Sequence, residues 1–329
     1  MNSASSKPIA DLSLDLDNQW SYMKTSGVAG WDSYPSYLSL VTPHILESLN
    51  NFDLRITFMV VGLDATIEEN LPPLKEIAST GHEIGNHSFK HEPWLQRYCW
   101  GDVVDELRAA EDALHRFCDR DIVGFRGPGY SLSSDVLDWL SQQNYIYDAS
   151  TFPTFLGPIS RLYYFFRSGL TTEEKLVRSS LFGSFADGFR RLRPYKWVTN
   201  YGEILEIPVS TMPISRMPFH FTYLHFLGQF SPLLARTYFK MCLFLCKVTK
   251  YSPSLLMHPL DFLGGDEIHP LRFFPGMKSK GVDKRKLMKD LLQILTRSFD
   301  VRCMREKADL ILTSMDQPLP AKRAQLIAS

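Results

Sequence analysis

Two clusters of acidic and imidazole side chains are the residues of this sequence best suited to chemistry. Asp15 and Asp17 stand one residue apart near the end of an apolar run, so both carboxylates can reach into one pocket. His87 and His91 have the i and i+4 spacing that places two imidazoles on one side of a helical turn. One carboxylate with two histidines leaves a coordination position open, as in catalytic metal sites. The pattern predicts a metal-dependent hydrolase.

The elements that must position these residues alternate between strands and helices along the chain. Apolar alternation or short apolar runs predict strands at 12–17, 54–61, 82–86, 122–126, 145–148, 204–209, 254–258 and 308–313. Amphipathic spacing predicts helices at 36–50, 67–79, 101–120, 133–142 and 284–297. Alternating strands and helices imply a parallel sheet, and this many repeats favour an α/β fold of the (β/α) barrel type.

Catalytic groups of such barrels sit where the strands end. Six side chains of this sequence fall at or just after predicted strand ends: Asp15, Asp17, His87, Arg126, Asp148 and His258. Each has a plain structural interpretation when taken alone, such as a turn residue, a surface histidine or an ion-paired arginine. Their convergence on one edge of the sheet favours a shared site. The metalloprotease pattern His-Glu-x-x-His fails, because Asn86 stands where its second histidine is required, so His82 and Glu83 are interpreted as structural.

Composition fits one cytoplasmic enzyme. The 329 residues suffice for one large α/β domain, and 36 basic against 36 acidic residues give no overall field that would attract nucleic acid. The five cysteines have no zinc-finger spacing, and neither a signal-peptide core nor a long apolar span is evident. We expect a single catalytic domain over 1–329, with an insertion at about 155–203 and a loose tail from about 316.

The assembled motifs resemble the polysaccharide deacetylase superfamily, the NodB-homology carbohydrate esterases. The acidic motif matches Ser13 to Asp17, the metal motif Gly81 to His91, the arginine-proline motif Phe125 to Tyr130, and the leucine-x-histidine motif Leu256 to His258. The resemblance covers residues 11 to about 150 and resumes near 204–315. It implies a distorted (β/α) barrel. Leu16 separates the two aspartates, which are usually adjacent in the family, and this Asp-x-Asp form resembles the branch of lipid-linked aminoarabinose deformylases.

The resemblance also implies a role for each residue. Asp17, His87 and His91 would hold a divalent metal, most simply Zn2+, with Fe2+, Co2+ or Mn2+ as alternatives. Asp15 would be the general base, oriented by Arg126, and His258 would protonate the leaving nitrogen. Asp148 or Asp261 would orient His258, and a backbone N–H near Gly129 or Tyr130 would stabilise the oxyanion.

A second feature is a charge void between Glu206 and Asp261, which contains no acidic residue. Ser231 and Pro232 predict a helix start, and the following helix carries Arg236, Lys240, Lys247 and Lys250 on one stripe of an apolar surface. Such a helix suits either an anionic membrane surface or burial against the barrel with its basic stripe in water. Residues 155–167 are predicted to expose an apolar patch, and Arg190, Arg191 and Arg193 form a basic cluster that could meet phosphate.

These observations predict an N-deacylase that removes acetyl or formyl from an amino-sugar. The preferred substrate is a lipid-linked or cell-envelope glycan precursor, met in the cytoplasm with peripheral contact to the inner membrane face. Two alternatives stay open. A small-molecule amidase of the same fold would act on a soluble linear or cyclic amide, and a catalytically silent protein would bind glycan without a metal.

Overall fold

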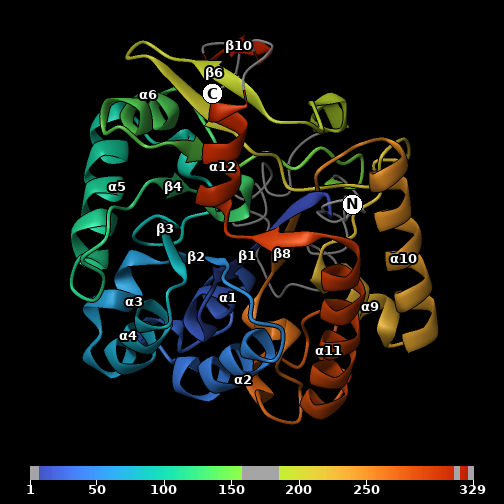
Figure 1. The fold of residues 1–329 in the computed structure, drawn as a ribbon. Helices are drawn as coiled ribbons and strands as arrows, with labels where there is room; N and C mark the ends of the chain where they lie inside the picture. Colours follow the sequence, from blue (N-terminus) through green and yellow to red (C-terminus); the bar gives the residue numbers. More distant parts are fainter. Residues whose placement is uncertain (1–6, 158–184, 315–318, 325–329) are drawn as a thin grey trace.

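The computed structural model of the protein describes residues 7–157, 185–314 and 319–324. Its centre is a ten-stranded sheet with helices packed around it (Figure 1). The strand order is β10–β6–β7–β5–β4–β3–β2–β1–β8, and β9 pairs with β1 outside this path. The strands are β1 (Ile9–Leu16), β2 (Thr57–Val60), β3 (Glu83–Asn86), β4 (Gly124–Phe125), β5 (Tyr147–Asp148), β6 (Tyr195–Val198), β7 (Glu203–Glu206), β8 (Ser254–Met257), β9 (Asp300–Arg302) and β10 (Ala321–Arg323).

Parallel pairing dominates the sheet, which confirms the predicted α/β class. Only β6 and β7 run antiparallel among the paired strands of the described residues. The described ladder does not run through a complete circle, but the segment after β7 links its two sides. There the Val209 N–H donates to Thr151 O and the Ser210 N–H donates to Ser254 O, both at 2.9 Å. These two hydrogen bonds connect the β5 side and the β8 side of the open sheet through irregular backbone.

Strand β1 shows how the sequence separates core from chemistry. Its even-numbered side chains, from Ala10 to Leu16, are apolar and buried in the main hydrophobic core. Its odd-numbered side chains, including Asp11, Ser13 and Asp15, point to the opposite side of the sheet because side chains alternate along a strand. The period of two therefore puts Asp15 and Asp17 on the same side at the end of β1.

The helices are α1 (Gln19–Ser26), α2 (Leu38–Asn50), α3 (Gly62–Thr66), α4 (Leu71–Ser79), α5 (Trp100–Leu114), α6 (Ser134–Gln142), α9 (Phe221–Gly228), α10 (Pro232–Val248), α11 (Gly281–Ser298) and α12 (Met304–Thr313). The helix start predicted at Ser231 and Pro232 is confirmed, and α6 begins with the same kind of serine cap. The Ser133 hydroxyl accepts from the Val136 N–H, and the Ser231 hydroxyl accepts from the Leu234 N–H, each at 3.3 Å. Within the described residues, we find no helix that has both the length and the apolar character to cross a membrane.

One predicted strand is wrong. Residues 308–313 belong to helix α12, in which Met304, Lys307 and Ala308 are buried at helical spacing. Short apolar runs do not separate helix from strand, and here the strand position is taken by β9 just before the helix.

Parts of the predicted insertion and of the predicted tail form strands of the sheet. Residues 195–198 of the insertion form β6, and residues 321–323, expected to be loose, form β10 and pair with β6. Most of the apolar patch predicted at 155–167 and the remainder of the insertion up to residue 184 lie outside the described residues.

We predict that Gly62→Ala destabilises the fold, because α3 and α5 approach closely at this glycine. A Cβ at Gly62 would stand 2.6 Å from the Ala110 Cα of α5, which is backbone and cannot move aside. We expect a loss of about 1–3 kcal/mol in the free energy of unfolding, measured by urea denaturation. Gly101→Ala is the matched control, since nothing lies within 4 Å of its added Cβ. Equal stability of the two variants would contradict this account of the packing.

Candidate metal centre

Asp17, His87 and His91 converge at the carboxyl ends of β1 and β3. Their ligand atoms all lie within 4.8 Å of one another, and all three residues are buried. The Asp17 Oδ1 atom lies 2.9 Å from His91 Nε2 and 3.3 Å from His87 Nε2. Because β1, β2 and β3 are parallel neighbours, residues after their last strand positions meet at one edge of the sheet.

The chain between the two histidines is a tight turn after β3 and not the helical turn that their spacing suggested. Ser88 and His91 have φ angles of 60° and 53°, in the left-handed region. The Ser88 hydroxyl accepts from the His91 N–H at 3.2 Å. The i and i+4 spacing thus brings both rings to one point through a different local backbone from the one expected.

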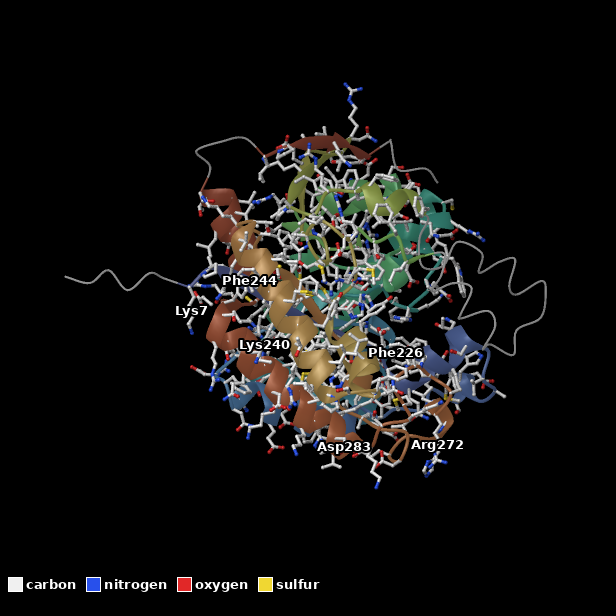
Figure 2. All side chains as sticks on the ribbon, turned by 90° about the vertical axis from the view of Figure 1, so that its right-hand side faces the viewer. Lys7, Phe226, Lys240, Phe244, Arg272 and Asp283 are labelled. Carbon is white, nitrogen blue, oxygen red and sulfur yellow. The ribbon has the colours of Figure 1, made fainter. Side chains whose placement is uncertain are left out.

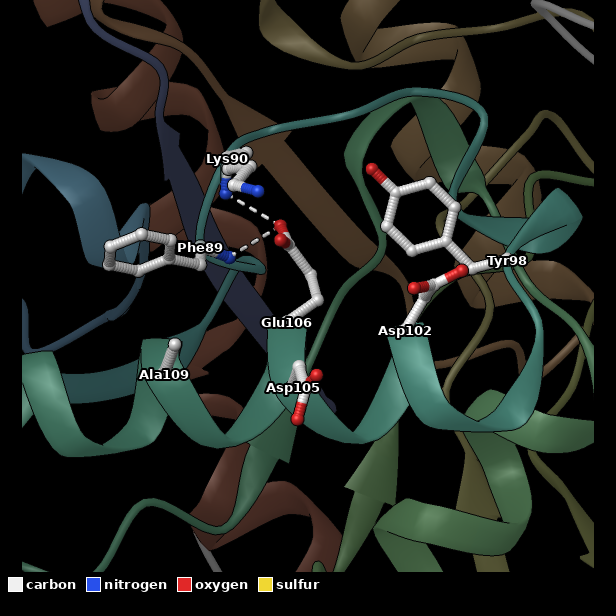
Figure 3. A pocket seen from close by; sticks show the side chains of 7 residues that line it. All are labelled: Phe89, Lys90, Tyr98, Asp102, Asp105, Glu106 and Ala109. Carbon is white, nitrogen blue, oxygen red and sulfur yellow. Dashed lines mark hydrogen bonds between the residues drawn. The ribbon is translucent and has the colours of Figure 1, made fainter.

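Glu106 of α5 fixes the outer side of this turn, and sequence reasoning missed it. Its Oε1 accepts from the Phe89 N–H at 3.0 Å and from the Lys90 N–H at 2.6 Å, as the dashed lines in Figure 3 mark. The side chain is buried, and burial raises the pKa of Glu106. The two N–H groups have no strand or helix partner of their own, so Glu106 supplies the acceptor that a buried turn requires.

The same residues line a hollow of about 540 Å³ between the turn and α5, shown in Figure 3. Its lining residues are Phe89, Lys90, Tyr98, Asp102, Asp105, Glu106 and Ala109. Asp17, His87 and His91 are not among them, so this hollow is separate from the candidate metal centre.

The His87 ring is set by a contact on its far side. His87 Nδ1 lies 2.6 Å from the Arg126 carbonyl oxygen, which accepts the Nδ1 proton and turns Nε2 toward Asp17. The buried Asp17 Oδ1 has no hydrogen-bond partner. A carboxylate oxygen and an imidazole nitrogen 3.3 Å apart require positive charge between them, which either a proton on the ring or a bound metal ion supplies. This donor set of two nitrogens and one oxygen fits a divalent metal.

The charged groups of the centre favour negative charge on Asp17 and positive charge on His87. Burial alone raises the pKa of Asp17, but His91 and His87 outweigh it and hold that pKa well below its ordinary value. Burial alone lowers the pKa of His87, but Asp15 and Asp17 outweigh it and raise that pKa. The acidic groups therefore favour positive charge at this point of the structure.

Asp15 is held by a fully buried arginine. Arg126 Nη1 donates to Asp15 Oδ1 at 2.6 Å and to the Ser13 hydroxyl at 3.0 Å, while Nε donates to the Ala149 carbonyl at 3.0 Å. The Arg126 side chain has no exposed surface. The orientation of the Asp15 carboxylate is therefore fixed by groups that are themselves immobilised by packing.

His258, at the end of β8, is oriented through Thr222 and Asp261. Thr222 Oγ1 lies 2.9 Å from His258 Nδ1 and donates to Asp261 Oδ2 at 3.2 Å. The hydroxyl that donates to Asp261 accepts the Nδ1 proton of His258, which leaves Nε2 as the atom that can give or take a proton. Asp261 also accepts from the His258 N–H at 2.8 Å. Thr222 was not found from the sequence, because no motif places it near His258.

Asp148, predicted as a residue that orients His258, makes other contacts. Its Oδ1 accepts from the Ser150 hydroxyl at 2.5 Å, and that hydroxyl accepts from the Gly127 N–H at 2.8 Å. Glu206 lies beside it in the paired strand β7, and burial raises the pKa values of both carboxyls. Asp148 thus supports the loop that follows Arg126, and Asp261, the other candidate, is the acid linked to His258.

Aromatic rings surround the catalytic side of the site. Tyr130 and Phe152 have ring centroids 4.9 Å apart, and the His220 ring lies 5.6 Å from Phe152 and 5.8 Å from His258. His220 is buried, its Nδ1 has no hydrogen-bond partner, and burial holds its pKa well below the ordinary value. The sequence does not single out His220, because only the folded chain brings its ring close to His258.

The basic cluster predicted near residue 190 is largely committed within the protein. Arg190 pairs with Asp187 at 2.5 Å, and Arg193 donates to the carbonyls of Thr249 and Lys250. Arg193 thus ties the insertion to the end of α10, whereas the Arg190–Asp187 pair lies within the insertion, and both contacts reduce the capacity of these arginines to bind phosphate.

Comparison with known proteins supports the resemblance inferred from the motifs. Residues 28–147 match the family described as polysaccharide deacetylase. Over 105 residues the chain is 30% identical to the peptidoglycan-N-acetylglucosamine deacetylase of Bacillus cereus, covering 32% of this chain and 37% of that protein. Over 99 residues it is 31% identical to the chitooligosaccharide deacetylase of Azorhizobium caulinodans, covering 30% of this chain and 46% of that protein. The chain therefore spans less than half the length of these relatives.

A solved structure from Mycobacterium smegmatis, described as a candidate polysaccharide deacetylase, shares the fold. The TM-score is 0.64 at 18% identity, with 98% of this chain and 96% of that chain covered. The family match contains His87, His91 and Arg126, whereas Asp15, Asp17 and His258 lie outside it. The fold brings both groups of residues together at one edge of the sheet.

We predict that Glu106→Ala weakens metal binding although Glu106 is no ligand. Without its carboxylate the Phe89 and Lys90 N–H groups lose their acceptor, and the turn that carries His91 loosens. We expect the zinc affinity, measured by competition with a chelating dye, to fall about 10-fold to 100-fold. Asp105→Ala, at an exposed neighbour in the same hollow, is the control and should bind zinc normally. Unchanged affinity in a folded Glu106→Ala protein would show that the turn holds its shape unaided.

Proposed function

We propose that this protein is a metal-dependent hydrolase that removes an N-acyl group, acetyl or formyl, from an amino-sugar. The observation that carries the proposal is the convergence of His87 Nε2 and His91 Nε2 on Asp17 Oδ1, next to the Asp15–Arg126 pair. The similarity to deacetylases of peptidoglycan and chitooligosaccharides supports an N-acetylated glycan as the substrate class.

The residues divide the reaction among them. Asp17, His87 and His91 would hold the metal, most simply Zn2+, with Fe2+, Co2+ or Mn2+ as alternatives. A divalent ion supplies a Lewis acid that lowers the pKa of water toward neutrality. Asp15, oriented by Arg126, accepts the proton of the attacking water as general base.

The oxyanion and the leaving nitrogen need two further donors. The Tyr130 N–H already donates to the Gly127 carbonyl at 2.9 Å, so of the two predicted backbone donors we propose the Gly129 N–H for the oxyanion. His258 donates its Nδ1 proton in a hydrogen bond to Thr222, and in its doubly protonated form it gives the Nε2 proton to the departing amine. Without that proton an amine is a poor leaving group.

For the substrate we propose a lipid-linked or cell-envelope glycan precursor rather than a mature polymer. The Asp-x-Asp spacing resembles the aminoarabinose deformylase branch, in which the sugar is carried on a lipid. We place the reaction in the cytoplasm at the inner membrane face, which is consistent with five cysteines that are all free thiols. The competing possibility is a soluble amide substrate. Activity on chitooligosaccharides or N-formyl amino-sugars in the absence of lipid shows whether the site requires the lipid part of the substrate.

We predict that Asp15→Asn keeps the metal and loses turnover, because the amide cannot accept a proton from water. Metal content is measured by elemental analysis on wild type, Asp15→Asn and His87→Ala. We expect about one metal per chain in the first two proteins, and its loss in His87→Ala. Turnover of N-acetylated and N-formylated amino-sugars should be undetectable in both variants.

Loss of metal from Asp15→Asn would show that the base and ligand roles are assigned wrongly. A wild type that binds no metal, even after metal is added, would remove the hydrolase proposal and favour a protein that only binds glycan.

We also predict that Thr222→Val lowers kcat by about 10-fold to 100-fold with little change in KM, because His258 loses the hydroxyl that fixes its Nδ1 proton. Thr222→Ser keeps that hydroxyl and should restore most of the rate. The basic limb of the kcat profile against pH should move in Thr222→Val but not in Thr222→Ser. Identical kcat in all three proteins would remove Thr222 from the orientation of His258.

A further inference from the structure

We propose that the outward side of α10 is a docking surface for an anionic lipid bilayer. This surface, called here the α10 face, consists of Phe230, Leu233, Leu234, Met241, Phe244 and Val248, with Lys240 and Lys247 along one edge. Figure 2 looks onto this side of the molecule, with Lys240 and Phe244 labelled on the helix and Phe226 beside it.

Helix α10 is apolar on both its inner and its outer side. Its inner residues Ala235, Phe239, Cys242, Leu243 and Cys246 are buried in the hydrophobic core. On the outer side, Phe230 is 74% exposed, Leu233 66%, and Phe244 and Val248 63% each. A helix that is apolar all round is usually covered on every side, so the exposed half indicates a surface that another apolar phase covers.

The arrangement around the helix axis is that of an interfacial helix. At 3.6 residues per turn, Leu233, Phe244 and Val248 fall within about 60° of one another. Lys240 and Lys247 follow on one side of them, at the border with the rest of the protein. Lysine side chains at such a border can reach lipid headgroups while the apolar residues enter the acyl region.

Charge favours an anionic bilayer over other occupants. No acidic residue occurs between Glu206 and Asp261, so a second copy seated on the same face would oppose lysine with lysine. Of the basic residues on the helix, Arg236 is already paired with Asp290 at 2.6 Å, whereas Lys240 and Lys247 are exposed, and the Lys247 amine also lies 5.6 Å from the centroid of the Phe299 ring. Nucleic acid would use the lysines but leave the phenylalanine and leucine side chains in water.

A further exposed apolar residue lies on a turn that is hydrogen-bonded to α10. Ile214 is 83% exposed with a φ of 81°, between the bridged residues Thr211 and Pro218. A β-branched residue rarely adopts that backbone region, so its presence at an exposed tip suggests a function. The Tyr238 hydroxyl of α10 donates to the Pro218 carbonyl at 2.9 Å and joins this turn to the helix.

The helix that precedes the α10 face carries a residue that contacts His258. Helix α9 leads directly into the α10 face, and Thr222 in its first turn contacts His258. Docking of α10 would therefore hold the site at a fixed position relative to the bilayer. The inference deepens the proposed function and rests on it for its purpose, because a lipid-linked sugar is met at a membrane surface.

The test is co-sedimentation of the full chain with vesicles, with and without anionic lipid. We expect wild type to bind vesicles of phosphatidylcholine and phosphatidylglycerol about tenfold better than vesicles of phosphatidylcholine alone, and 0.5 M salt to reduce that binding. Leu233→Ser with Phe244→Ser should abolish binding, and Leu310→Ser, an exposed apolar position on α12, should not.

Lys240→Glu with Lys247→Glu should remove the preference for anionic lipid. The matched control is Lys286→Glu with Lys289→Glu, which makes the same charge change at exposed positions of α11. Vesicle binding that is absent in wild type, or equal in the α10 variants and their controls, would overturn the proposal. So would a wild-type dimer in light scattering that becomes monomeric in Leu233→Ser with Phe244→Ser, since the face would then join two copies.

Deacylation of a soluble amino-sugar is measured on the same proteins and separates the two proposals. An α10 variant that loses vesicle binding but keeps this activity supports the docking surface. A wild type that binds vesicles but hydrolyses no amino-sugar would remove the proposed reaction and leave the surface standing.

Discussion

The buried guanidinium of Arg126 is the contact on which the site depends. A charge with no exposed surface must have every donor satisfied, and Arg126 finds its acceptors on β1 and in the loop after β5. Its own carbonyl oxygen sets the ring of His87. One residue therefore holds the Asp15 carboxylate through its side chain and the His87 ring through its carbonyl oxygen, so the positions of these two groups depend on each other.

The side of the sheet that carries Asp15 and Arg126 also holds other buried polar side chains. Lys307 of α12 reaches into it and forms a buried ion pair with Asp11, which also accepts from the Ser254 hydroxyl at 2.6 Å. Glu83 accepts from Thr57 and from Tyr147, at 2.5 and 2.8 Å. The main apolar core lies on the other side of the strands, and a second, smaller apolar cluster that includes Met59, Tyr147 and Met304 packs beside the polar network. Removing one partner of such a network costs more than the network contributes as a whole, because the remaining group stays buried without a partner.

The sequence predicted those parts of the site that depend on strand ends. Asp15, Asp17, His87, Arg126 and His258 meet because parallel strands finish at one edge, and that follows from element order alone. It could not predict Glu106, Thr222 or His220, since their contacts arise from how helices and loops pack onto the sheet. The turn from His87 to His91 shows a second limit. The spacing correctly indicated that the two rings converge, but it suggested a helical turn, whereas Ser88 and His91 have left-handed backbone angles. Residues 308–313 failed because an apolar run of that length fits either period.

The pairing of β10 with β6 has a consequence for how the sheet ends. Strand β6 carries Tyr195 and Trp197, which are buried, and without a neighbour its backbone would be an open template for another chain. β10 covers that edge with three residues, of which Lys322 and Arg323 are basic, and the Lys322 amine lies 5.3 Å from the Tyr195 ring. The final edge of the sheet is thus short and charged, which disfavours the strand-to-strand association between molecules that a longer apolar edge would invite.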